Sequence, residues 1–77
     1  MVQRLVVGDF EFAEDNLGFP VVRCVAFHDL TTGERGTLWA DALGSVPSVF
    51  TGDYTLVAYA AKAELSCFTA LGWPFPP

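Results

Sequence analysis

The sequence predicts a small α/β domain in which four strands precede a single C-terminal helix. Two observations lead to this prediction. Apolar runs rich in β-branched and aromatic residues alternate with turn signals up to about residue 60, a pattern typical of strands. From Ala61 the chain becomes alanine-rich over about three turns, which favours a helix. A chain of 77 residues forms at most one small domain, so residues 1–77 are expected to be a single unit.

The first strand is predicted over Leu5–Phe12, an apolar run interrupted by Asp9 and Glu11. Apolar residues at both alternating positions are typical of a central strand. Because alternate side chains of a strand share one face, both carboxylates are expected on the same face. Two adjacent carboxylates in an apolar strand indicate a divalent metal site. The alternative is a solvated pair at the end of an edge strand.

A loop is predicted over Ala13–Pro20, which ends in Gly-Phe-Pro. Val21–Leu30 is rich in Val and Phe and predicts the second strand. Residues 31–34 read Thr-Thr-Gly-Glu and predict a turn, after which Arg35–Ala40 returns as the third strand. The second and third strands are therefore expected to form a hairpin.

The connection Asp41–Asp53 has no helical period and is expected to be irregular, with room for one short helical turn. Tyr54–Ala60 predicts the fourth strand. The helix is expected over Ala61–Leu71, because Gly72 is suited to terminate it and Pro74 cannot continue it.

Composition excludes several classes of function. Four basic residues against nine acidic ones give a net charge of −5, which leaves no basic surface for a nucleic-acid backbone. Contact with polyphosphate would need metal ions or another segment. No apolar stretch approaches the roughly 20 residues of a membrane span. The apolar run near the N-terminus is interrupted by Asp9 and is too short for a secretory signal. A cytoplasmic protein is therefore expected. Cys24 and Cys67 are expected to be reduced and buried.

One helix can cover only one face of a four-stranded sheet. The predicted strands carry apolar residues on both faces, so the sequence predicts an exposed apolar face. We expect this face to be covered by a second copy of the chain or by a partner chain.

A third acid, Glu64, falls in the first turn of the predicted helix, where the helix dipole favours a carboxylate. If the fourth strand lies beside the first, Glu64 comes near Asp9 and Glu11. Three carboxylates together would be suitable ligands for Mg²⁺ or Mn²⁺.

With these residues in view, the chain resembles the amino-terminal half of a DEDD-type 3′–5′ exonuclease domain, as in the proofreading domains of bacterial and phage family A DNA polymerases. The resemblance rests on the Asp-x-Glu strand, the hairpin and the stretch Leu56–Leu65. Residues 18–24 and 70–76 fit the same group. It implies a partial ribonuclease H-like fold and a two-metal hydrolysis of single-stranded DNA from its 3′ end, with Mg²⁺ or Mn²⁺ as cofactor.

The resemblance also implies roles for single residues. Asp9 would bridge the metals, and Glu11 would bind one of them and orient the attacking water. Glu64 stands where the second family motif has an aspartate, and Ala60 replaces a supporting asparagine. Phe12 would contact the substrate by wedging against the terminal base.

The third family motif, a Tyr or His followed by a final Asp, would lie beyond Pro77. We therefore expect an incomplete exonuclease domain that is inactive alone, and a second chain could supply the missing groups. The alternative is a non-catalytic interaction or dimerisation module that keeps the exonuclease-like sheet.

Overall fold

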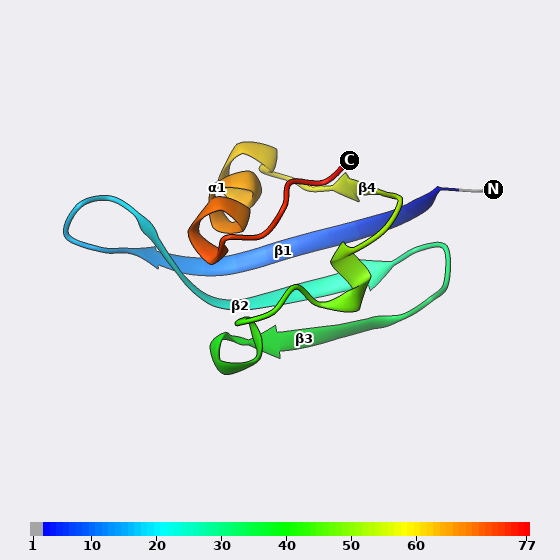
Figure 1. Ribbon diagram of the computed structural model, residues 1–77, viewed down its shortest axis with the longest axis horizontal. Helices are drawn as coiled ribbons and strands as arrows, with labels where there is room; N and C mark the ends of the chain where they lie inside the picture. Colours follow the sequence, from blue (N-terminus) through cyan, green and yellow to red (C-terminus); the bar gives the residue numbers. More distant parts are fainter. Residues whose placement is uncertain (1–2) are drawn as a thin grey trace.

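The computed structural model describes residues 3–77, which form a four-stranded sheet with one helix packed against it (Figure 1). The elements, in chain order, are β1 (Arg4–Glu14), β2 (Pro20–Asp29), β3 (Arg35–Trp39), the 3₁₀ turns η1 (Ala40–Ala42) and η2 (Ser48–Phe50), β4 (Tyr54–Val57) and α1 (Ala61–Leu71). The predicted α/β class is confirmed, and the helix has the predicted bounds.

The strands lie in the order β3-β2-β1-β4. β2 pairs antiparallel with both β1 and β3, whereas β1 and β4 are parallel. Parallel neighbours need a crossover connection, and here the β2–β3 hairpin and residues 40–53 provide it. The condition under which Glu64 is expected near the first strand, namely that β4 lies beside β1, is therefore met.

The core lies between one face of the sheet and α1. Alternation along β1 sends Val6, Gly8 and Phe10 to this face, where Val6 and Phe10 are buried. The central members of the core are aromatic, and neighbouring ring centroids lie 5.5 to 6.4 Å apart. These aromatic residues are Phe10, Phe27, Phe50, Tyr54, Phe68 and Trp73.

A β-bulge between Glu11 and Phe12 adjusts the pairing of β1 with β2. Glu11 pairs with Cys24 and Phe12 pairs with Val22, so Arg23 has no partner in the register. The extra residue changes the phase of β2, which allows Phe12 and Val22 both to pack against the core.

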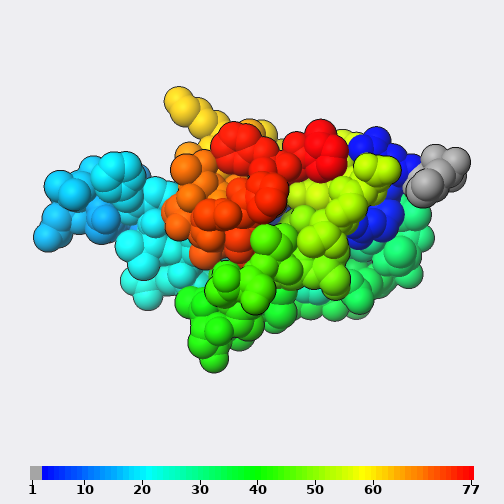
Figure 2. Space-filling view, viewed as in Figure 1, coloured from blue at the N-terminus to red at the C-terminus, as the bar shows by residue number. Residues whose placement is uncertain are grey.

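Beyond the bulge, β1 and β2 continue as a hairpin that projects from the body (Figure 2). Its turn is held by Asp15, whose Oδ1 accepts hydrogen bonds from the backbone N–H groups of Leu17 and Phe19. Both of these apolar side chains are exposed. This hairpin explains why β1 continues past its predicted end at Phe12 to Glu14 and why β2 begins at Pro20, one residue earlier than predicted: the predicted loop at 13–20 is partly strand.

The opposite end of β1 is fixed by a partly buried ion pair. The Arg4 guanidinium donates to the Asp29 carboxylate at 2.9 Å and to the carbonyl oxygens of Val49 and Thr51. Burial raises the pKa of Asp29, but the Arg4 hydrogen bond, backbone N–H donors from the β2–β3 turn and the Arg4 charge outweigh it and leave this pKa lowered. This cluster joins β1, β2 and the irregular connection.

The helix α1 ends as predicted at Gly72, which adopts a left-handed conformation with φ 71°. The backbone N–H of Trp73 donates to the carbonyl of Phe68, which completes the helix cap. The indole N–H of Trp73 also donates to the carbonyl of Leu43, which joins the C-terminal tail to the irregular connection.

The face of the sheet away from α1 carries both apolar and polar side chains. Leu5, Val57 and Trp39 are exposed by 44, 41 and 63%. Asp9 and Glu11 lie on the same face, so its apolar surface is interrupted by charge. Three exposed apolar side chains thus lie on this face, and its coverage by a partner stays a prediction. Within residues 3–77, no helix has the length and apolar character that crossing a membrane requires.

Candidate functional site

The candidate site lies where β1 continues past the end of β4. The parallel register runs from Arg4 opposite Tyr54 to Val7 opposite Val57, where β4 ends. The predicted fourth strand extended to Ala60, but residues 58–60 instead turn toward α1. From Gly8 onward, β1 therefore has no strand neighbour on this side. In open α/β sheets, ligands commonly bind just outside the carboxyl ends of parallel strands.

Asp9 and Glu11 project from β1 just beyond this point. Both side chains are exposed, and both face away from α1 because Gly8 and Phe10 occupy the core side. Their cross-strand partners on β2 are Ala26 and Cys24. The two carboxylates are thus neighbours on one face, as the two-residue spacing predicts.

Glu64 approaches the same stretch of β1 at the edge that β4 leaves open. Its side chain is buried, and its Oε2 accepts a hydrogen bond from the backbone N–H of Phe10 at 3.0 Å. Burial raises the pKa of Glu64, the Phe10 hydrogen bond opposes that rise, and the negative charge of Asp9 adds to it. The effect of Asp9 indicates that the two carboxylates are close enough to interact electrostatically.

Among residues 3–77, Asp9, Glu11 and Glu64 do not form one compact group of carboxylates. Their oxygens are suitable for Mg²⁺ or Mn²⁺, but Glu64 lies at the open edge of β1, where it accepts the Phe10 N–H, whereas Asp9 and Glu11 project from the face away from α1. Among residues 3–77, no three His, Cys, Asp or Glu side chains are grouped so that they could hold a metal ion. The metal ligation by Asp9, Glu11 and Glu64 stays a prediction.

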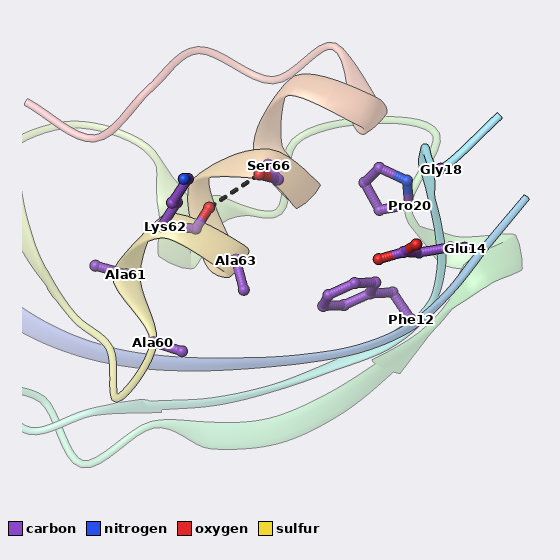
Figure 3. A pocket seen from close by; sticks show the side chains of 9 residues that line it. All are labelled: Phe12, Glu14, Gly18, Pro20, Ala60, Ala61, Lys62, Ala63 and Ser66. Atoms are coloured by element: carbon purple, nitrogen blue, oxygen red, sulfur yellow. Dashed lines mark hydrogen bonds between the residues drawn. The ribbon is translucent and has the colours of Figure 1, made fainter.

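Phe12, the predicted substrate contact, lies in a groove of about 520 Å³ between the β1–β2 hairpin and the start of α1 (Figure 3). The phenyl ring of Phe12 and the carboxylate of Glu14 point toward α1, with Lys62 on the far side. The groove lies on the α1 side of the sheet, so β1 itself separates Phe12 from the exposed acidic pair.

Sequence reasoning missed Glu14 as part of this groove because it assigned the residue to a loop. The signal was available: Phe10, Phe12 and Glu14 are spaced by two and share one face once the strand extends to Glu14. What could not be anticipated is the pairing of residues 12–14 with residues 20–22, which makes that stretch a strand.

Comparisons with protein-family models, with curated proteins and with solved structures found no match to this chain.

Proposed function

We propose that this chain forms the amino-terminal part of a DEDD-type 3′–5′ exonuclease domain that acts on single-stranded DNA 3′ ends. The observation that carries the proposal is the acidic pair: Asp9 and Glu11 project side by side just past the carboxyl end of β4. The mixed order β3-β2-β1-β4 followed by a helix is compatible with a partial ribonuclease H-like fold.

In this proposal Asp9 and Glu11 are the residues that would hold Mg²⁺ or Mn²⁺. Two exposed carboxylates make an incomplete site, since two-metal nucleases need further ligands and a group that handles the proton of the attacking water. We propose that these groups come from a segment or chain that covers the face carrying the acidic pair. Residues 3–77 by themselves are then inactive.

The resemblance implies Phe12 as the contact for the terminal base, but its groove lies across β1 from the acidic pair and is not part of the proposed metal site. Its groove has the size of a small-molecule site, for which volumes of roughly 300–1,000 Å³ are typical. Lys62 lines the α1 wall of the groove, and Glu14 opposes it from the hairpin.

Calorimetric titration of the chain with MnCl₂ tests the acidic pair. We expect Mn²⁺ binding, with affinity reduced at least tenfold by Asp9→Asn and by Glu11→Gln. Asp53→Asn removes an exposed carboxylate far along the sequence and should leave the affinity unchanged. No binding by the parent chain, or equal binding by the parent and Asp9→Asn, would overturn the proposal.

A 3′-labelled single-stranded oligonucleotide tests the incompleteness of the site. With Mn²⁺ present, the chain alone should release no label. Release that depends on Asp9 would show that residues 1–77 carry a complete active site, and it would overturn the proposal of a half-site.

A second candidate function is a non-catalytic interaction or dimerisation module. The observation that favours it is the exposure of Leu5, Val57 and Trp39 on the face away from α1. In this case light scattering at high concentration should show a dimer that Trp39→Ser weakens. Tyr59→Ser, which changes a fully exposed aromatic residue outside the strands, should have no effect. A strictly monomeric parent chain would exclude self-association.

A further inference from the structure

We propose that Glu64 is a positioning residue, which holds β1 where it continues past β4 and thereby orients Asp9 and Glu11. The inference rests on the proposed function, because it assumes that the acidic pair is the part of the site that binds metal. It assigns Glu64 a role different from the direct ligation that the resemblance implies.

The first argument is the missing strand neighbour. β4 pairs with β1 only through Val7, so the backbone N–H of Phe10 has no β4 carbonyl to bond. A buried N–H without an acceptor costs free energy comparable to a lost hydrogen bond. Glu64 Oε2 accepts this hydrogen bond at 3.0 Å and so replaces the absent strand.

The second argument is that Phe10 is attached to α1 twice. Its N–H bonds to Glu64, and its ring packs edge-on against Phe68 with the centroids 5.6 Å apart. Glu64 and Phe68 are four residues apart and so lie on the same face of the helix. Both attachments act on the residue between Asp9 and Glu11, so they fix the backbone from which the two carboxylates project.

The third argument concerns the direction of the Glu64 carboxylate. Its Oε2 lies at the edge of β1 that β4 leaves open, where it takes the place of the missing acceptor, while the Asp9 and Glu11 side chains project from the face away from α1. The Glu64 oxygen is therefore engaged by the backbone of the residue between Asp9 and Glu11, through which it can orient both side chains. Positioning through the backbone needs no shared ion.

Two substitutions of similar size separate positioning from ligation. Glu64→Gln keeps an oxygen that can accept the Phe10 N–H, whereas Glu64→Met keeps the length and removes the acceptor. Neither variant keeps a carboxylate. A metal ligand is disabled by both changes, but a hydrogen-bond acceptor is disabled only by Met.

Amide hydrogen exchange of Phe10, followed by NMR, measures the hydrogen bond directly. Protection should stay within about threefold of the parent in Glu64→Gln and fall at least tenfold in Glu64→Met. In the same samples, Mn²⁺ affinity should be retained by Glu64→Gln and reduced at least threefold by Glu64→Met, with line broadening centred on the amides near Asp9 and Glu11.

The inference is overturned if Glu64→Gln weakens Mn²⁺ binding as much as Asp9→Asn does, since Glu64 would then be a ligand. Unchanged Phe10 protection in Glu64→Met also overturns it. If the parent chain binds no Mn²⁺, the proposed function fails, while the exchange data on Phe10 still test whether Glu64 holds the strand. If Glu64→Met fails to fold, the comparison of Mn²⁺ affinity between the parent chain and Glu64→Gln still decides whether Glu64 is a ligand.

Discussion

The buried thiol of Cys67 lies one turn along α1 from the carboxylate of Glu64. Burial, and after it the negative charge of Glu64, raises the pKa of Cys67 to about 11. Two ionisable groups are thus held in the core side by side, and each has its charged form disfavoured. This relationship gives the stability of the domain a dependence on pH at both ends of the scale.

At alkaline pH the domain should lose stability because of Cys67. A thiol whose folded pKa is raised keeps its proton in the native state while the unfolded state releases it. Stability therefore falls as pH rises from about 9 to about 11, by on the order of 2 kcal/mol. Urea unfolding across this range measures the loss.

Cys67→Ala is the control, because it removes the titrating thiol and should make this slope shallower, although the cavity lowers stability at every pH. Tyr54, whose pKa is also raised by burial, adds a further loss in the same direction that both proteins share. An unchanged slope in Cys67→Ala would contradict the prediction.

At mildly acidic pH the stability should depend on Glu64. Its folded pKa lies above the ordinary value of 4.5, chiefly through burial, so the native state binds a proton more readily than the unfolded state does. Stability should then fall as pH rises through the window above about 4.5. Glu64→Gln, compared with the parent in urea unfolding at several pH values, should lose this dependence while Asp53→Asn keeps it. A steeper fall with pH in Glu64→Gln than in the parent would contradict a raised pKa at Glu64.

Gly8 should not tolerate a branched side chain. A Cβ at this position would lie 3.2 Å from Leu56 Cδ1 and 3.5 Å from the Phe50 ring. We expect Gly8→Val to lower the free energy of unfolding by about 1–3 kcal/mol through overpacking. Gly44→Val is the matched control, because a Cβ there meets nothing within 4 Å. Equal midpoints of urea unfolding for the two variants would contradict the close approach.

Phe50 should contribute more to stability than its place in an irregular connection suggests. Its ring packs against five aromatic rings with centroids 5.6 to 6.4 Å away. Phe50→Ala should cost about 3–5 kcal/mol, which is enough to unfold a marginal domain of this size. Phe75→Ala, at an aromatic residue that is 61% exposed, should cost under about 1 kcal/mol. Thermal unfolding followed by circular dichroism distinguishes the two.

Local signals predicted the secondary structure where neighbours in sequence determine it. The bounds of α1 follow from alanine content, Gly72 and Pro74, all of which act within one or two turns. The length of β1 could not be predicted in this way, because residues 12–14 are strand only through pairing with residues 20–22. The end of β4 at Val57 could not be predicted either, because the sequence stays apolar as far as Ala60.

For the site, the sequence by itself determined that Asp9 and Glu11 share a face, because the side chains of a strand alternate with a period of two. Only the tertiary structure decided which face that is, since the packing of Phe68 and Phe50 against Phe10 placed the core on the opposite side. It also decided the environment of Glu64. The helix carries that carboxylate to the Phe10 N–H because β4 ends too early to bond it. An unsatisfied backbone donor, which no sequence pattern records, explains where the third acid lies.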